Sequence, residues 1–154
     1  MKPALALAFV AVLRAQNLTI TGNMAKPLTL TKADLAKMPR TSAQFNDEGT
    51  ETNYDGVLLC DILKQAGAPL DKQLMGKALA TYILAEARDG YQVVYALADI
   101  DPNFGANKIL VADTVNGKPL FDYQGPFRLV VPGDKKGARS IRMLEKISVV
   151  RLRK

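Results

Sequence analysis

The segment with the clearest chemical potential is an apolar, strand-like run that carries one arginine and leads into a basic loop. The run is Phe127-Arg128-Leu129-Val130-Val131, and it ends at Pro132-Gly133. The loop that follows holds four cations: Lys135, Lys136, Arg139 and Arg142. Backbone N–H groups in a glycine-containing loop, together with guanidinium forks, form pockets for anions. The pattern therefore predicts an anion site that includes Arg128.

A purely structural interpretation of the same cations stays open. Burying an arginine without a partner costs several kcal/mol, so some group must face Arg128. Nearby acids can supply that group if Arg128 and Arg139 pair with Asp122 or Glu145. In that case the arginines only hold the loop in place.

Several kinds of catalytic chemistry are excluded by composition. The 154 residues include no histidine, and Cys60 is the only cysteine. A Ser-His-Asp triad, a Cys-His pair and a histidine-ligated metal are therefore impossible. One thiol cannot form an internal disulfide or a CxxC redox pair. The flanks of Cys60, Leu58-Leu59 and Ile62-Leu63, predict a buried and inert thiol.

The overall composition is that of a globular domain with a basic surface. Hydrophobic residues make up 48% of the chain and charged residues 23%, which argues against disorder and against a coiled coil. The formal charge is +6, yet aromatic residues are only 6% and tryptophan is absent. A stacking platform for bases is therefore not expected, and no nucleic-acid motif accompanies the charge. We expect no nucleic-acid partner.

The amino terminus has the pattern of an export signal. Met1-Lys2 is followed by the uncharged apolar run from Ala4 to Leu13, and Ala15 is a small residue at a suitable cleavage point. This run is too short to span a bilayer. We therefore expect a signal peptide over residues 1–15, a single domain over 16–154, no membrane span, and a periplasmic or secreted protein. A buried N-terminal helix is the alternative.

The remaining pattern predicts an α+β domain with a mixed or mostly antiparallel sheet and small helices. Helices are expected from Thr31 to Ala36 and near 59–66, with one helical turn at 97–100. Strands are expected at 18–20, 28–30, 41–46, 78–87, 91–96, 108–115, 127–131 and 144–152.

Four local signals fix the ends of these elements. Thr31 and Asp34 have the spacing of a capping box, and Gly67 stands where a helix ends. Asp89-Gly90 and Asn116-Gly117 each lie between strand-like runs, which predicts two hairpin turns.

The order of segments resembles the oxidoreductase molybdopterin-binding domain of sulfite oxidases, which also forms the catalytic subunit of periplasmic methionine sulfoxide reductase. The resemblance spans roughly residues 18–150. Its matching stretches are Leu28-Thr29-Leu30 with Asp34-Leu35 and Met38-Pro39; Tyr54-Asp55-Gly56-Val57-Leu58-Leu59 with Asp61-Ile62-Leu63 and Ala66-Gly67; Asp89-Gly90-Tyr91; and the long stretch from Asn116-Gly117-Lys118-Pro119-Leu120 through Gly125-Pro126 to Arg142.

The resemblance implies the sulfite-oxidase-type fold and a pterin cofactor whose phosphate lies at the basic loop. By position, Arg128, Ser140 and Arg142 match cofactor contacts. Tyr123 stands where sulfite oxidase has a histidine that contacts the cofactor. Arg139, from the basic loop, is also expected to be a cofactor contact.

One departure bears directly on function. The family's molybdenum is held by a cysteine that precedes the Tyr-x-Gly-Val segment, whereas residues 41–49 contain no cysteine and Cys60 follows that segment. A soft thiolate ligand is not replaced by Asn or Phe. We therefore expect no metal site and no bound cofactor, although molybdopterin is possible by resemblance.

Two functions from different classes follow. The first is a non-catalytic exported module that binds an anionic small molecule or an exported redox partner protein. The second is a molybdopterin-dependent oxidoreductase that binds its cofactor without a cysteine ligand. A purely structural accessory subunit of an exported redox complex differs from the first only in having no pocket.

Overall fold

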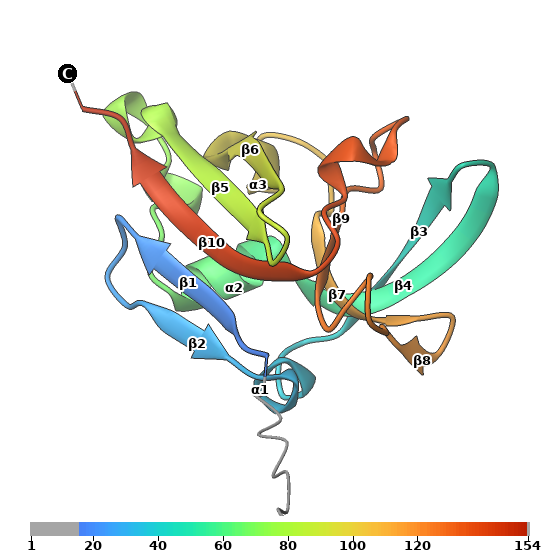
Figure 1. Ribbon diagram of the computed structural model, residues 1–154. Helices are drawn as coiled ribbons and strands as arrows, with labels where there is room; N and C mark the ends of the chain where they lie inside the picture. The colour runs from blue at the N-terminus through green and yellow to red at the C-terminus, as the bar shows by residue number, and fades with distance from the viewer. Residues whose placement is uncertain (1–15, 154) are drawn as a thin grey trace, which may run out of the picture.

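Two five-stranded sheets organise the chain in the computed structural model, which describes residues 16–153 (Figure 1). Short helices fill the connections between strands. The strands are β1 (Leu18–Gly22), β2 (Leu28–Leu30), β3 (Thr41–Asp47), β4 (Thr50–Leu58), β5 (Thr81–Ala87), β6 (Gln92–Ala96), β7 (Leu110–Val115), β8 (Lys118–Pro119), β9 (Arg128–Val130) and β10 (Leu144–Arg151). The helices are α1 (Lys32–Ala36), α2 (Leu59–Gln65), α3 (Leu97–Ile100) and the 3-10 turns η1 (Asp71–Gln73), η2 (Gly76–Ala80) and η3 (Gly137–Arg139).

The first sheet has the order β2-β1-β10-β5-β6. Its strands pair antiparallel except for β1 and β10, which run parallel with Ile20 opposite Ile147. This pair joins the first and last described strands of the chain. The mixed sheet predicted from the sequence is therefore confirmed, and β10 is its central strand.

The second sheet has the order β3-β4-β7-β8, and β9 also pairs with β7. The long β3–β4 hairpin extends away from the first sheet (Figure 1). A small core that includes Phe45, Tyr54, Leu110 and Val130 holds this hairpin to β7 and β9.

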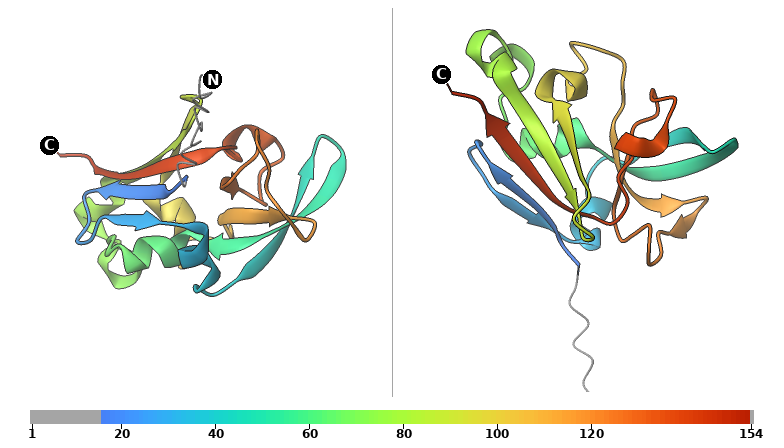
Figure 2. Two further views of the ribbon diagram at one scale, coloured as in Figure 1. Left: turned by 60° about the horizontal axis from the view of Figure 1, so that its bottom comes forward. Right: turned by 45° about the horizontal axis from the view of Figure 1, so that its top comes forward.

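The main core lies between the first sheet and α2, which covers one side of β1 and β10 (Figure 2). Helix α2 buries Leu59, Ile62 and Leu63, which are fully inaccessible to solvent. Leu18 and Ile147 face them from the sheet side of the same cluster. Because apolar burial is the dominant stabilising term, this cluster fixes how the sheet and helix are placed.

The local sequence signals are confirmed. Asp34 N donates to Thr31 Oγ1 at 3.1 Å, and Thr31 N donates to Asp34 Oδ2 at 2.8 Å, which completes the capping box of α1. Gly67 has a φ of +78° directly after α2. Asn116 and Gly117 both have positive φ, as the tight turn between β7 and β8 requires.

Gly56 permits a close approach of two central strands. It pairs with Ala112 beside a register shift in the β4–β7 ladder. A Cβ atom at this position would lie 2.0 Å from Val111 O. Any larger residue must therefore push β4 away from β7.

Some expected boundaries were wrong. The strand predicted from residue 78 begins at Thr81, because residues 76–80 form η2. The strand predicted from residue 108 begins at Leu110. The predicted signal peptide lies outside the described residues. No helix among residues 16–153 is long and apolar enough to cross a membrane.

Candidate functional site

A cavity of about 620 Å³ opens where turns from both sheets meet the basic loop; we call it the basic cavity. The β3–β4 turn, the β5–β6 turn and β9 each contribute to its wall. The lining residues are Asn46, Glu48, Asp89, Tyr91, Tyr123, Arg128, Lys135, Lys136, Gly137, Ala138, Ser140, Ile141, Arg142 and Met143.

Four of the five residues predicted as cofactor contacts line this cavity: Tyr123, Arg128, Ser140 and Arg142. They come from different segments of the chain, and β9 and the folded loop bring them together. The sequence prediction that the cations of this region surround one pocket is consistent with this arrangement.

Arg128 lines the basic cavity from a buried position on β9. Arg128 is only 1% exposed, although it contributes to the cavity wall. Arg128 Nη1 donates to Tyr54 Oη at 2.5 Å, and the guanidinium carbon lies 5.0 Å from the centroid of the Tyr54 ring. The tyrosine therefore orients a buried cation through a hydrogen bond and a cation–π contact.

Arg139 is placed differently from the sequence expectation. Its guanidinium is absent from the lining of the basic cavity and makes two hydrogen bonds of 2.8 Å to Asp134. The bond to Asp134 raises the pKa of Arg139 further. The guanidinium also lies 5.3 Å from the centroid of the Tyr95 ring. Arg139 thus holds the loop, but through Asp134 rather than through Asp122 or Glu145.

Two tyrosines from the β5–β6 hairpin fasten the basic loop. Tyr91 Oη donates to Ala138 O at 2.8 Å, and Tyr95 Oη donates to Arg139 O. Burial raises the pKa of Tyr95 well above its ordinary value, so its phenol stays a neutral donor. Tyr95 is buried in the core, whereas Tyr91 is about half exposed at the rim.

Ser140 connects the far end of the basic loop to Val131, the residue that follows β9. Its Oγ accepts a hydrogen bond from Val131 N at 3.0 Å in a buried position. The hydroxyl hydrogen stays available to a ligand, because the bond uses only an oxygen lone pair. The loop is therefore held at three points before any ligand arrives, which lowers the entropic cost of binding.

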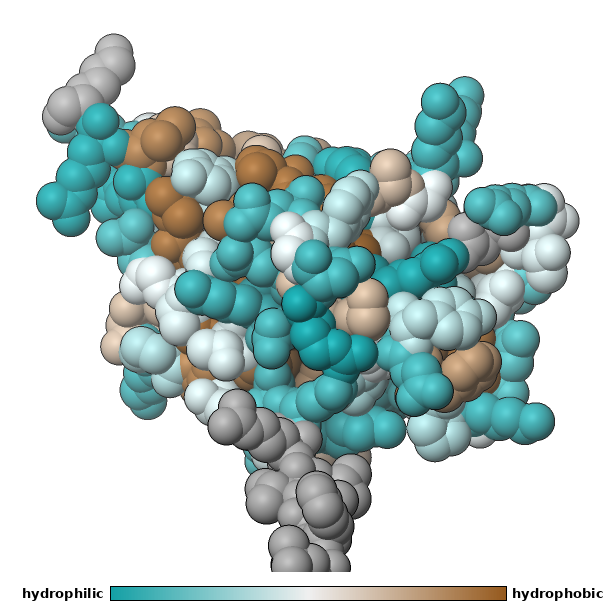
Figure 3. Space-filling model, viewed as in Figure 1, coloured by the Kyte–Doolittle hydropathy of each residue, from teal (hydrophilic) through white to brown (hydrophobic). Residues whose placement is uncertain are grey.

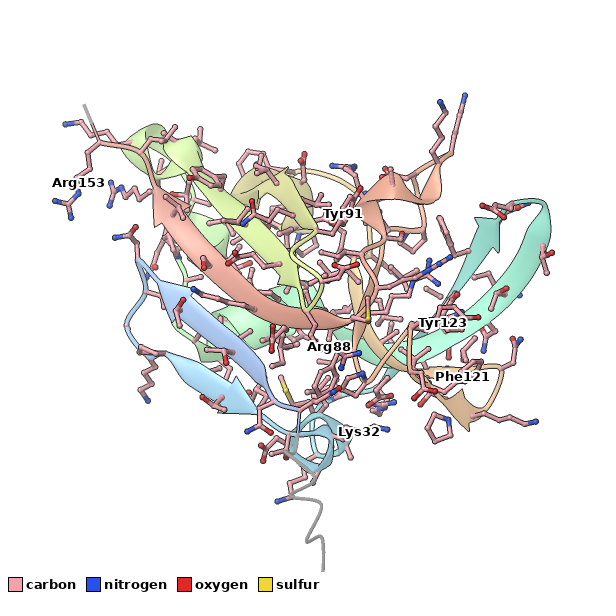
Figure 4. All side chains as sticks on the ribbon, viewed as in Figure 1. Lys32, Arg88, Tyr91, Phe121, Tyr123 and Arg153 are labelled. Carbon is pink, nitrogen blue, oxygen red and sulfur yellow. The ribbon has the colours of Figure 1, made fainter. Side chains whose placement is uncertain are left out.

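Tyr123, labelled in Figure 4, and Arg142 are both exposed and form the rim of the basic cavity. The guanidinium carbon of Arg142 lies 5.8 Å from the centroid of the Tyr123 ring. Tyr123 in turn packs edge-on against Phe121, with 5.7 Å between ring centroids. Each of these two aromatic residues is more than half exposed.

The charge balance of the basic cavity favours an anion. Among the described residues that line it, four are cations (Arg128, Lys135, Lys136 and Arg142) and two are carboxylates (Glu48 and Asp89). Asp89 Oδ1 already accepts a hydrogen bond from Tyr91 N at 3.1 Å. Positive charge in a partly enclosed site strengthens attraction to an anion relative to open water.

Sequence reasoning missed the contribution of two hairpin turns. Asn46 lies near the end of β3 and Glu48 in the β3–β4 turn, whereas Asp89 and Tyr91 come from the β5–β6 turn. The only signal for the second turn was the match of Asp89-Gly90-Tyr91 to the family pattern.

The single thiol of the chain lies away from this site. Cys60 is 8% exposed on α2, belongs to the main core and is absent from the cavity lining. Burial raises the pKa of Cys60, which disfavours the thiolate. The prediction of a buried thiol is confirmed. Among residues 16–153 no three His, Cys, Asp or Glu side chains are grouped so that they could hold a metal ion.

Comparison with known proteins agrees with the fold. Residues 10–154 match the family described as "Oxidoreductase molybdopterin binding domain". No curated protein matches the chain. The crystal structure of the sulfane dehydrogenase SoxCD from Paracoccus pantotrophus aligns with a TM-score of 0.67 and 22% sequence identity. The alignment covers 89% of this chain but only 39% of that one.

The sheets, the loop and the cavity define a domain of the molybdopterin-binding class. The chain belongs to the oxidoreductase molybdopterin-binding domain family. The resemblance noted in the sequence and the sulfite-oxidase-type α+β fold are both confirmed.

The residues of this chain fit the phosphate end of the family's cofactor but not its metal end. The cations Arg128, Lys135, Lys136 and Arg142 suit the phosphate of a pterin cofactor. The metal end lacks its soft ligand, because the only cysteine lies in the core on α2. No chemical step can therefore be assigned to a thiolate-bound molybdenum in this chain.

Proposed function

We propose that this domain is a non-catalytic module that binds a phosphate-bearing or similarly anionic small molecule in the basic cavity. The observation that carries the proposal is a cavity in which described cations outnumber carboxylates while no thiolate lines it. The anchored loop supports the proposal, since Tyr91, Tyr95 and Ser140 hold the binding groups in place. Each charge-assisted hydrogen bond to the ligand contributes about 1.5–3 kcal/mol.

Calorimetric titration with pyrophosphate at constant ionic strength tests this function. We expect saturable binding that weakens about tenfold in Arg142→Gln, because one charge-assisted contact is lost. Lys118→Gln is the matched control, since Lys118 is an exposed cation on β8 away from the cavity. Equal affinity in both variants, or no saturable binding, would contradict the proposal.

The second candidate is a molybdopterin-dependent oxidoreductase that holds its cofactor without a cysteine ligand. Family membership and the basic cavity favour it. Elemental analysis after co-expression with the cofactor's biosynthetic enzymes separates the two functions. The binding-module proposal predicts well under one molybdenum per chain. One molybdenum per chain, retained through gel filtration, would establish the second candidate instead, and Cys60→Ser would then show whether Cys60 holds the metal.

We also propose that the domain is exported and acts in the periplasm or outside the cell. The charge-free run from Ala4 to Leu13, which follows Lys2, supports this. An exported redox protein is a suitable partner. The intact mass of protein produced in a cell that recognises the signal should correspond to loss of residues 1–15. A cytoplasmic protein that keeps Met1 would contradict export.

A further inference from the structure

A second cavity, of about 1020 Å³, lies beside the end of β10; we call it the C-terminal groove. It is lined by residues 22–24, 69, 77, 80–81 and 151–153. None of these residues lines the basic cavity. The two sites lie at opposite ends of the β5–β10 pair, where Thr81 is opposite Arg151 and Ala87 is opposite Leu144. The intervening strand length is about 20 Å.

Hydrogen bonds donated by backbone N–H groups fix the walls of the C-terminal groove. Asn23 N donates to Val149 O at 2.8 Å, and Arg151 N donates to Asn23 Oδ1 at 3.0 Å. Beyond β10, Leu152 N donates to Ala80 O at 2.9 Å. The segment that follows β10 is therefore held against η2 and the β1–β2 turn.

Apolar side chains line part of the groove and continue onto the surface beside it. Met24, Pro69 and Leu152 line the groove, and Leu152 is 62% exposed. On the adjoining segment, Met75 and Leu79 are also exposed. Apolar surface gathers near the C-terminal end of the molecule in Figure 3. Exposed apolar patches of this kind commonly mark binding sites.

The same groove carries three cations and no carboxylate among its described lining residues. The cations are Lys77, Arg151 and Arg153, the last labelled in Figure 4. None of them takes part in an ion pair with another residue of 16–153. Positive charge is thus concentrated next to apolar surface without local neutralisation.

A buried hydroxyl provides an independent indication of a missing partner. Thr81 lines the groove and is 2% exposed. Its Oγ1 has no hydrogen-bond partner among the described residues. Buried polar atoms normally have a partner, so the wall of the groove holds an unsatisfied polar group at Thr81.

We propose that the C-terminal groove binds a small anionic amphiphile, with a carboxylate or phosphate head and an apolar tail. Lys77 and Arg151 bind the head, and the tail lies over Met24, Pro69 and Leu152. The cations alone would bind any anion. The apolar wall alone would bind any apolar molecule. Their combination selects a ligand that carries both features.

Calorimetry with monomeric decanoate, below its micelle concentration, tests this site. Decanol and acetate serve as the tail-only and head-only probes. We expect saturable binding of decanoate and at least about tenfold weaker binding of either control probe, because each lacks half of the recognition. Lys77→Gln and Arg151→Gln should each weaken decanoate binding about three- to tenfold. Lys118→Gln should leave it unchanged.

Leu152→Asp tests the apolar wall separately and should abolish decanoate binding while thermal unfolding stays cooperative. Arg142→Gln, in the basic cavity, should leave decanoate binding intact, so failure of the proposed function and failure of this inference are distinguishable. Equal decanoate affinity in all variants would overturn the proposal. Binding to anionic vesicles without binding of monomeric decanoate would also overturn it, in favour of a membrane surface.

Discussion

Arg128 and Tyr54 lie 74 positions apart in the sequence and meet in the core, where Arg128 Nη1 donates to Tyr54 Oη at 2.5 Å. Tyr54 belongs to β4 and Arg128 to β9, and β7 lies between these two strands. The contact spans the second sheet and presents a buried cation to the basic cavity. Arg128 therefore has a structural role, through its bond to Tyr54, and a binding role, through its position in the cavity wall.

Arg128→Met tests that double role. Loss of a buried, charge-assisted bond should lower the free energy of unfolding by about 1.5–3 kcal/mol. Pyrophosphate should also no longer raise the melting temperature in a salt-matched comparison. Tyr54→Phe removes the hydroxyl but keeps the cation, so it should retain the pyrophosphate effect. An Arg128→Met protein as stable and as responsive as the wild type would contradict this account.

Gly56→Ala should destabilise the domain without touching either cavity. The added Cβ would lie within 2.0 Å of Val111 O, so β4 and β7 must separate. We expect a loss of about 1–3 kcal/mol in urea unfolding, as is usual for overpacking. Gly49→Ala is the comparison for a glycine with open space around it, although its φ of +87° adds local strain. A Gly56→Ala protein of wild-type stability would contradict the close-approach argument.

The Arg40–Asp113 pair predicts a specific pH dependence. Arg40 makes hydrogen bonds of 2.9 and 2.6 Å to the Asp113 carboxylate, which is buried on β7. Burial alone would raise the pKa of Asp113, but hydrogen bonds from Arg40 and Thr114 lower it below its ordinary value. The stability that this carboxylate contributes is therefore complete above about pH 5 and is lost as the pH falls below about 4.

Arg40→Met should consequently cost about 1–3 kcal/mol at pH 7 and less at pH 3, because the stability that the ionised Asp113 contributes is progressively lost as the pH falls below about 4. Urea midpoints of the variant and the wild type at the two pH values measure the difference. A difference in stability that is the same at pH 7 and pH 3 would show that Arg40 acts through packing alone.

Cys60 should react slowly with thiol reagents in the folded protein. It is 8% exposed, and burial raises its pKa, so little thiolate is accessible. At pH 8 we expect alkylation at least about tenfold slower than in denaturant. Equal rates in the two conditions would contradict its placement in the main core.

Local features of the fold could be predicted from the sequence because their causes are local. The capping box of Thr31 and Asp34, the helix end at Gly67 and the Asn116-Gly117 turn each depend on residues a few positions apart. The parallel pairing of β1 with β10 could not be predicted in the same way, because no short-range pattern specifies which distant strands become neighbours.

The residues of the site likewise divide into those that the sequence identified and those that only the tertiary structure places. Arg128, Ser140 and Arg142 were identified through their family positions, and Tyr123 with them. Arg139 was assigned to the cavity because it is a cation in the right loop, yet Asp134, five residues away, takes its guanidinium. Glu48 and Asp89 were missed as cavity residues, since only tertiary folding brings the two hairpin turns to the basic loop.

The most direct test of the central claim is an amide chemical-shift titration of the ¹⁵N-labelled protein with pyrophosphate at constant ionic strength. We expect saturable shifts concentrated in residues 135–143 and in Tyr91, which is hydrogen-bonded to that loop through Ala138 O. The C-terminal groove and β8 should change little. Shifts that do not saturate, or that are spread over all exposed cations, would contradict a specific anion site in the basic cavity.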